Sequence, residues 1–536
     1  MALTRTTLHG CVALCVMVCG AQTLHALPRD ANGWTIFTPS TDTVKIYVSS
    51  SVGDDAFNGL MPDPDGAGGG PKRTVAEGLK LLRPQQPDWL LLRRGDTWTD
   101  PGSLNVPRKL DKSLGFDIGG GRAANEPQIV AAYGSSPERP LLRTSTPVVN
   151  IVGNGVTRFV AWVGLHCYAF TRDPASPDFA TTLSATGYVI PRHNPNGFRI
   201  LGHASGWTGD FLIEDCVIDF FDGGITCQTN MRNMAVRRCI ITNSYNGQFP
   251  DSNNGYPDRS QGIFCIDTLG LLVEECLLYH NGWNATMGYG MSIYSHNMYL
   301  STDINPCRVI GNIACGAGSN GGQMRAGGIA DNNLFLRNPI GLFLSGDPNG
   351  AEEGINTCIN NVFVEANDIV NNQGEVARRG VGLDIKRKPL GFYKGNICLD
   401  RLSARQQAGI RCTEDPITTA PPILVTGNIV RNWNNASGQG IEVPPELVND
   451  FILTGNVVDG KDQAGNPVVF PDPNRNMDTY MNHLGIGGGW EEFIRRAAAR
   501  PWGQWPREFS ADGFNDYIRE GFGMDQKTAA SYVLIH

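Results

Sequence analysis

The chain has 536 residues, of which 18% are charged, and a formal net charge of −8 at pH 7. A chain this acidic is poorly suited to nucleic acid, so we expect no nucleic-acid partner, and an acidic polymer would need a local basic patch. The length suggests more than one globular domain, but a solenoid escapes that rule because it grows by adding coils.

The first 26 residues have the pattern of a secretory signal peptide. Arg5 supplies a positive charge, residues 11–21 form an apolar stretch too short to span a membrane, and Leu24-His25-Ala26 ends in a small residue suited to cleavage. The alternative is a buried N-terminal helix. We therefore expect a secreted or periplasmic protein with no membrane span, acting as a monomer.

Residues 45–100 read as strand, loop, helix and strand. Residues 74–82 carry Val75, Leu79 and Leu82 at helical spacing before Pro84, and this helix is expected to plug the N-terminal end of a solenoid. In the loop between, Asp54, Asp55, Asp63 and Asp65 could bind Ca²⁺, or they could cap ordinary turns. Calcium is the only cofactor that the sequence suggests.

Five short runs between residues 261 and 386 repeat one pattern: Gly or Asn second, then an apolar or small residue, a variable one and an apolar one. They are residues 261–267, 296–301, 320–325, 340–345 and 381–386. A period of two predicts strands, and the repetition predicts a solenoid. The third and fifth positions should point inward. The outward positions then hold Gln261, Phe264, His296, Tyr299, Gln323, Arg325, Asp384 and Lys386, a polar and aromatic surface suited to a long polar polymer.

A second repeat reads apolar, any, any, Cys or Asn, apolar, apolar. Its anchors are Cys216, Cys239, Cys276 and Asn312, with looser copies at Asn333, Asn361, Asn396, Asn428 and Asn456. Asn side chains stacked in this way can hydrogen-bond to one another. Irregular spacing between anchors predicts loops of different length at one corner of each coil. Cys216, Cys239 and Cys276 should be buried free thiols, although export would permit disulfides.

These motifs, with Ile46-Tyr-Val-Ser49 and Gly95-Asp-Thr-Trp98 near the start, resemble right-handed parallel β-helix proteins of the pectate-lyase-like superfamily. The resemblance covers roughly residues 45–475. It implies an all-β, right-handed parallel β-helix over residues 27–475, with a cap at 45–100 and coils at 120–475. The superfamily includes lyases, hydrolases, epimerases and non-catalytic proteins, so the fold does not select an activity.

The candidate catalytic residues are His296, Tyr299 and Arg325 on adjacent coils, with His280 at the end of the preceding strand. Histidine and tyrosine can transfer protons, and arginine can neutralise a carboxylate. This set suits β-elimination from a uronic acid, and without bond cleavage it suits C5 epimerisation. Residues that we expect to bind substrate are Asp258, Arg259, Gln261, Trp283, Gln323 and Lys386. Each side chain alone could instead be structural.

Two rival interpretations remain open. Asp251, Asp258 and Asp267 fall near the same face and would suit a glycoside hydrolase. The alternative is a non-catalytic protein that binds glycan or builds a surface structure. Arg378, Arg379, Lys386, Arg387 and Lys388 form a basic run that could grip an anionic polymer or form a solvated loop.

Residues 476–536 change character. Residues 491–500 and 511–520 have helical periodicity, with Ser510 as a cap and Gly521 at the end of the second helix. We expect a helical tail that folds back on the solenoid and covers its C-terminal end. The proline-rich residues 171–196 are expected to form a long loop.

Overall fold

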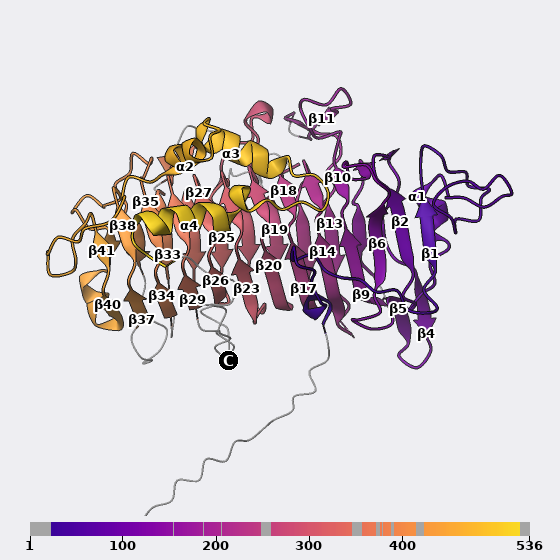
Figure 1. Cartoon of the computed structure of the whole chain (residues 1–536), viewed down its shortest axis with the longest axis horizontal. Helices are drawn as coiled ribbons and strands as arrows, with labels where there is room; N and C mark the ends of the chain where they lie inside the picture. Colours follow the sequence, from indigo (N-terminus) through magenta and orange to yellow (C-terminus); the bar gives the residue numbers. More distant parts are fainter. Residues whose placement is uncertain are drawn as a thin grey trace, which may run out of the picture.

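The structure is a computed structural model that describes residues 23–153, 155–185, 187–204, 206–247, 259–345, 356–370, 376–377, 379–386, 391–413 and 423–525. Figure 1 shows strands stacked side by side along the long axis, from the N-terminal coils at one end to the C-terminal coils at the other. In this part of the chain three long parallel sheets surround one apolar core, so the predicted parallel β-helix is confirmed.

The largest sheet has 15 strands. Its main path is β1 (Lys45–Val48), β2 (Trp89–Arg93), β6 (Gln128–Tyr133), β9 (Gly155–Val163), β14 (Thr208–Glu214), β17 (Met231–Arg237), β20 (Thr268–Glu274), β23 (Cys307–Ile310), β26 (Gly328–Asp331), β29 (Asn356–Ile359), β34 (Gly391–Lys394), β37 (Ile423–Thr426) and β40 (Phe451–Thr454). The strands β4 (Arg108–Asp111) and β5 (Phe116–Gly120) join this sheet beside β9.

The 12-stranded sheet consists of β3 (Thr97–Thr99), β7 (Leu141–Arg143), β10 (His166–Tyr168), β15 (Val217–Asp219), β18 (Ile240–Thr242), β21 (Leu277–Tyr279), β24 (Ile313–Cys315), β27 (Leu334–Leu336), β30 (Val362–Val364), β35 (Ile397–Leu399), β38 (Ile429–Arg431) and β41 (Val457–Val458). The 10-stranded sheet consists of β8 (Val149–Ile151), β13 (Phe198–Leu201), β16 (Ile225–Gln228), β19 (Gln261–Cys265), β22 (His296–Leu300), β25 (Asn320–Met324), β28 (Ile340–Leu344), β33 (Val381–Ile385), β36 (Ile410–Cys412) and β39 (Ile441–Glu442).

One coil takes a strand from each sheet in turn, as β19, β20 and β21 do before β22 begins the next coil. The five runs singled out in the sequence are β19, β22, β25, β28 and β33, consecutive strands of the 10-stranded sheet. Their third and fifth residues, such as Met298 and Leu300 of β22, lie in the core as predicted. Loops leave two corners instead of the one predicted: residues 280–295 follow β21, whereas residues 301–306 follow β22.

A ladder of buried asparagines runs through the interior, as the second repeat predicts. The side-chain N–H of Asn312 donates to Asn333 Oδ1 at 2.9 Å, and the same bond recurs from each ladder residue to the next up to Asn456. Each of these side chains also reaches a backbone carbonyl, so its buried polar atoms are satisfied. The ladder keeps successive coils in register along the axis of the solenoid.

The thiols of Cys216, Cys239 and Cys276 continue the same slot toward the N-terminus. The backbone N–H of Cys276 donates to Asn312 Oδ1 at 2.8 Å, which joins the two parts of the ladder. All eleven cysteines of the described residues are buried and free, as predicted for these three. Burial raises the pKa of the Cys216 thiol well above its usual value, which keeps the thiol protonated and unreactive.

The N-terminal end is closed by α1 (Val75–Leu79), with Thr74 accepting a bond from Glu77 N as its cap. In the loop considered for Ca²⁺, two of the carboxylates contact the local backbone and an arginine. Asp55 accepts from the N–H groups of Arg73 and Thr74, and Asp63 pairs with Arg93 at 2.9 Å. Across the described residues no three His, Cys, Asp or Glu side chains converge as metal ligands would.

Residues 24–43 form a strap across the outer face of the 15-stranded sheet. A short 3-10 helix, Leu24–Ala26, places Leu24 in an apolar cluster with Leu212 and Ala235. Further along, Arg29 forms a bidentate contact with Glu274, at 3.2 and 2.8 Å. The strap covers apolar side chains that would otherwise face solvent.

The helical tail lies along the side of the solenoid, where Figure 1 draws it in yellow. It contains α2 (Met477–His483), α3 (Gly489–Ala498) and α4 (Ala511–Gly521), and Ser510 caps α4 as predicted. Phe493 and Phe514 pack on outward residues of the 12-stranded sheet, such as Leu334. The prediction that the tail covers the C-terminal end is therefore wrong, because these strands have apolar residues on their outer face.

Residues 171–196 are not a simple loop, since they contain the antiparallel hairpin of β11 (Thr181–Leu183) and β12 (Val189–Pro191). A smaller hairpin pairs β31 (Ile369–Val370) with β32 (Val376–Ala377). Within the described ranges, the helices are too short or too polar to cross a membrane.

Candidate functional site

The 10-stranded sheet presents a continuous row of outward side chains, one from each coil. In register order the row is Asn150, Arg199, Thr226, Phe264, Tyr299, Gln323, Phe343, Asp384, Arg411 and Glu442. The next outward slot, after each strand ends, holds Ser301, Arg325, Ser345 and Lys386 on successive coils. We call the two rows together, from Phe264 to Arg411, the outer stripe. It brings Tyr299, Gln323, Arg325 and Lys386 onto one face, as the period of two predicts.

Tyr299 and Arg325 form the central contact of the outer stripe. Arg325 Nη1 donates to the Tyr299 hydroxyl oxygen at 3.0 Å, across adjacent strands. Both side chains are half-buried, so each is held by the sheet and still reaches solvent. A guanidinium that donates to a phenol oxygen stabilises negative charge on that oxygen. Phe264 lies beside Tyr299, with the two ring centroids 5.4 Å apart.

His296 lies beneath this pair and differs from its predicted exposed position. Its side chain is buried, its ring centroid is 5.5 Å from that of Tyr299, and its Nδ1 accepts the Asn320 N–H at 3.2 Å. Burial, with a smaller contribution from the charge of Arg379, lowers the pKa of His296 to about 3. His296 is therefore neutral at pH 7 with its proton on Nε2, which suits a hydrogen-bond donor and not a solvent-exposed base.

Gln261 is also buried, and its side chain hydrogen-bonds to the backbone at the start of the next coil. Its Nε2 donates to the Tyr294 carbonyl at 3.0 Å, and its Oε1 accepts the His296 N–H at 3.0 Å. Both ends of the amide are thus engaged within the protein, so the structure does not present Gln261 to a ligand. Gln323 remains on the outer stripe, where its Oε1 accepts from Asn320 Nδ2 at 3.3 Å.

His280 lies at the end of β21, on the 12-stranded sheet, and no contact joins it to Tyr299 or Arg325 in the described residues. Its Nδ1 lies 2.9 Å from Asn243 Oδ1, and its ring meets that of Trp283 edge-on at 4.2 Å. Burial lowers the pKa of His280 to about 4. Trp283 donates to the Gly316 carbonyl of the next coil at 3.0 Å, whereas the His280 ring contacts Asn243 of the preceding coil, so these two residues anchor the start of the 280–295 loop.

Two predicted binding residues, Asp258 and Arg259, lie in the part of the sequence between β18 and β19. Asp258, like Asp251, lies outside the described residues. Arg259 is exposed, and its guanidinium carbon lies 5.6 Å from the ring centroid of Tyr294.

A basic pocket opens on the outer stripe next to Gln323. Its cavity is about 130 Å³, and its lining includes Phe343, Arg379, Asp384, Lys386 and Arg411. Arg411 holds the buried Asp384 carboxylate with two bonds, at 2.7 and 3.3 Å. Arg411 was not predicted as a site residue. The signal was present in the sequence, because Ile410-Arg-Cys412 is one more copy of the outward-alternating strand.

The carboxylates needed by a glycoside hydrolase are poorly placed in the described residues. Asp267 accepts the Asn230 N–H at 2.6 Å and has a positive φ of 49°, as a turn cap does. Asp384 and Glu442 belong to the same outward row, but Arg411 lies between them and binds the Asp384 carboxylate through two bonds. A glycosidase needs both carboxyl groups facing the sugar, and Asp384 is buried and engaged by Arg411.

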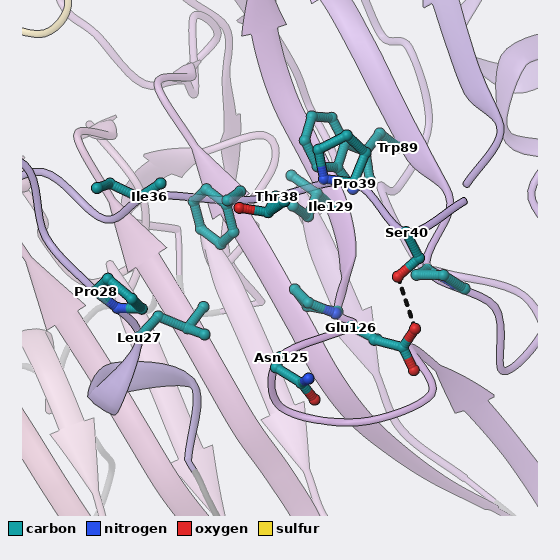
Figure 2. Close-up of a pocket in the computed structure, with 13 residues that line it drawn as sticks. Leu27, Pro28, Ile36, Thr38, Pro39, Ser40, Trp89, Asn125, Glu126 and Ile129 are labelled. Carbon is teal, nitrogen blue, oxygen red and sulfur yellow. Dashed lines mark hydrogen bonds between the residues drawn. The ribbon is translucent and has the colours of Figure 1, made fainter. Parts of the chain in front are cut away.

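A larger cavity, about 390 Å³, lies between the N-terminal strap and the 15-stranded sheet. Figure 2 shows apolar and proline side chains around it, including Pro39, Trp89 and Ile129, and a bond from Ser40 to Glu126. The Ser40 hydroxyl donates to Glu126 Oε1 at 2.6 Å, which ties the strap to the sheet. This cavity has no adjacent acid, base and cation set comparable with the outer stripe among the described residues that line it.

The sequence matches no family model, and no curated protein matches it. Solved structures with a similar fold include a rhamnogalacturonan lyase, at 12% identity and a TM-score of 0.38, covering 84% of this chain and 98% of the other. A pectate lyase has 13% identity and a TM-score of 0.38, covering 83% and 85%. The A-module of an Azotobacter vinelandii mannuronan C-5 epimerase has 12% identity and a TM-score of 0.37, covering 69% and 86%. At these values the comparisons assign no activity to this chain.

Proposed function

We propose that this protein is a polysaccharide lyase that cleaves an acidic, uronate-containing glycan by β-elimination on the outer stripe. The observation that carries the proposal is the 3.0 Å bond from Arg325 to the Tyr299 hydroxyl, beside a pocket with three cations and one carboxylate. Among the described residues that line this pocket, basic side chains outnumber acidic ones, although the chain as a whole has a net charge of −8. Basic side chains on this face suit an anionic polymer laid along the sheet.

In the proposed reaction Arg325 binds the uronate carboxylate and makes the C5 proton more acidic. The Tyr299 phenolate, stabilised by the same guanidinium, takes that proton. The C5–H electron pair forms the C4=C5 double bond as the C4–O4 bond breaks, and the new Tyr299 phenol gives its proton to O4. The products are a reducing end and an unsaturated uronide. Arg325 acts mainly on the enolate-like transition state, where negative charge has moved onto the carboxylate.

The geometry favours elimination over C5 epimerisation. An epimerase must remove a proton from one face of the sugar and return one to the other, so it needs two proton-transfer groups on opposite faces. In the described part of the outer stripe Tyr299 is the half-exposed acid–base group that contacts Arg325, and His296 lies below it on the same side. In elimination, one residue can serve as base and then as acid when the C5 proton and O4 leave from the same face of the sugar.

The substrate class implies that the protein works outside the cytoplasm. Long acidic glycans are extracellular or periplasmic polymers, and the first 26 residues have the pattern of an export signal. We therefore propose a secreted or periplasmic location for the enzyme.

The test is incubation of the purified protein with pectate, alginate and glycosaminoglycans, reading ultraviolet absorbance of unsaturated uronides and reducing ends in parallel. Rise of both signals on one of these polymers supports β-elimination. Reducing ends without the absorbance would indicate a hydrolase, and a change in uronate composition without either signal would indicate an epimerase. Binding with no product on the whole panel would support the non-catalytic alternative.

A further inference from the structure

A polar pocket lies on the 15-stranded sheet, on a different sheet from the outer stripe. Its cavity is about 370 Å³, and the side chains that matter here are those of Gln85, Gln86, Arg122, Arg158 and Phe159. We call it the glutamine pocket. Gln85 and Gln86 belong to the connection between α1 and β2, Arg122 follows β5, and Arg158 and Phe159 belong to β9.

The pocket arises where β9 changes its partner strand. Residues 155–158 of β9 pair with β5, whereas residues 160–163 pair with β6. Residues 121–127 connect β5 to β6 as a turn outside the two strands. Phe159 lies at the point of change and has a φ of 57°, a left-handed conformation that is uncommon for an aromatic residue. The hollow beside Phe159 therefore follows from the topology of the sheet.

The backbone beneath the pocket is held in one conformation. The Gly121 N–H donates to the carbonyl oxygens of Arg158 and Phe159, at 3.0 and 3.1 Å. Gly120 has a φ of 95°, and a Cβ at this position would collide with the Arg158 carbonyl oxygen, so the strand requires glycine here. The positions of Arg158 and Phe159 are thus set by β5 before any ligand binds.

Trp207 orients both of these side chains. Its ring centroid lies 6.2 Å from that of Phe159 and 4.0 Å from the guanidinium carbon of Arg158, and its carbonyl accepts from Arg158 Nε at 3.1 Å. Both Phe159 and Arg158 are half-buried. Within the described residues the two Nη groups of Arg158 make no further hydrogen bond, so they can donate to a ligand beside the Phe159 ring.

The two glutamines provide amide groups on the other side of the pocket. Gln85 has a φ of 58°, and its side-chain amide makes no hydrogen bond to another described residue. Gln86 Oε1 accepts from Arg122 Nη2 at 2.8 Å, so Nε2 is the part of this amide that is left for a ligand. Amides both donate and accept hydrogen bonds, as hydroxyl groups do.

The charges around the pocket favour a neutral ligand over an anion. Arg122 pairs with the carboxylate of Asp42, and with that of Glu126 at 3.1 Å. An anion placed beside Arg122 would therefore meet two carboxylates and be repelled by them. A ligand that presents neutral hydroxyls meets no such repulsion.

We infer that the glutamine pocket binds a neutral sugar ring of a polysaccharide, stacked on Phe159 and hydrogen-bonded through its hydroxyls to Gln85, Gln86 and Arg158. A pyranose has an apolar C–H face and hydroxyls around its rim, which match an aromatic side chain flanked by amide and guanidinium donors. The cavity is in the size range of small-ligand sites. This inference goes beyond the proposed function, because the pocket would attach the protein to a glycan whether or not the outer stripe cleaves one.

The test measures binding of cellotetraose, mannotetraose and galactotetraose to the whole protein by calorimetry. For a tetrasaccharide that the wild type binds, the double variant Gln85→Ala, Gln86→Ala should weaken binding by on the order of tenfold, since hydrogen bonds from two amides are lost. The matched control is Gln463→Ala, Gln504→Ala, which changes two exposed glutamines outside the pocket and should bind as the wild type does.

Phe159→Leu gives a second comparison, because it keeps an apolar side chain and removes the aromatic ring. It should also weaken tetrasaccharide binding, and thermal unfolding shows whether it remains folded. The double glutamine variant should keep full lyase activity on a soluble polyuronate, because the pocket and the outer stripe are on different sheets.

Equal binding of the tetrasaccharides by the double glutamine variant and the wild type would overturn the inference, and so would the absence of binding to all three. Tetragalacturonate and inorganic phosphate are the anionic probes. If the wild type binds one of them but no neutral tetrasaccharide, and the double glutamine variant loses that binding, the pocket is an anion site and the neutral-sugar assignment is wrong.

Discussion

The backbone N–H of Asn320 donates to Nδ1 of His296 at 3.2 Å, across two adjacent coils. An Nδ1 that accepts a bond cannot carry the proton of a neutral imidazole, so that proton must be on Nε2. The contact thus leaves Nε2 as the ring nitrogen of His296 that can donate a hydrogen bond. A buried, neutral imidazole of this kind is poorly suited to the role of a solvent-exposed base, which the sequence suggested for His296.

The tautomer is a direct prediction. In ¹⁵N NMR of histidine-labelled protein, one histidine should show an unprotonated Nδ1 and a protonated Nε2 that do not titrate as the pH falls from neutral to mildly acidic. His296→Asn should remove that signal. If the signal that disappears in His296→Asn comes from a ring that titrates near neutral pH, His296 is not buried as described.

His296 should also make the protein less stable in acid. Its pKa is 6.5 in the unfolded chain and is lowered to about 3 by burial, so the unfolded state binds a proton that the folded state does not. The stability that follows is present above pH 6.5 and is lost as the pH falls. At pH 5 this loss is about 2 kcal/mol.

Urea unfolding of the wild type and His296→Asn at pH 7.5 and pH 5 checks this, because the contributions of other groups cancel in the difference. On acidification, the free energy of unfolding of the wild type should fall by about 2 kcal/mol more than that of the variant. The exposed His483 is the matched control, and His483→Gln should fall in parallel with the wild type. Parallel behaviour of His296→Asn would contradict the prediction.

Replacing a single asparagine of the ladder should destabilise the fold. Asn396 accepts bonds from the backbone N–H and the side chain of Asn361, at 3.0 Å each, and donates to Asn428 at 2.9 Å. Asn396→Ala leaves these buried groups without partners, so unfolding free energy should fall by roughly 2–5 kcal/mol. The exposed Asn482→Ala on α2 serves as the control, and equal effects from the two changes would refute the ladder's role.

The N-terminal strap makes a prediction about processing. Leu24 has no exposed surface and packs against Leu212 and Ala235, a burial that stabilises the fold by about 1.5–3 kcal/mol. Cleavage after Ala26, as the sequence suggests, would remove Leu24. We expect the exported protein to begin at Gln22, after the small residue Ala21. Mass spectrometry of protein from its native host checks this, and a chain that begins at Leu27 would contradict it.

The sequence predicted the outer stripe because alternation in a strand fixes which side chains share a face. Tyr299 and Arg325 could be placed together from their positions in two copies of one run. The burial of His296 and Gln261 could not be predicted, since it depends on the path of the 281–295 loop. Arg411 was missed because its strand follows a long connection.

The side on which the tail packs could have been foreseen. The strand Leu334-Phe-Leu336 is apolar at every position, as are Val362-Phe-Val364 and Ile397-Cys-Leu399. Continuous apolar runs of this kind indicate strands covered on both faces. The sequence did not show which element covers the outer face of these strands. Even after Ile397-Cys-Leu399, more than 75 residues of chain, roughly two further coils, come before the helices of the tail.

The measurement that tests the central claim most directly is formation of unsaturated uronide by the wild type, Arg325→Ala and Tyr299→Phe on the same polyuronate. Both variants should lose on the order of 10²–10³-fold in kcat, since each removes a group that acts on the transition state. Their melting temperatures should stay close to that of the wild type, because half-buried outward side chains cost little to shorten. The matched controls are Arg495→Ala and Tyr188→Phe, exposed residues away from the stripe, which should keep full activity. Full activity in Arg325→Ala and Tyr299→Phe would contradict the account, and loss of activity together with stability would show that the pair is structural.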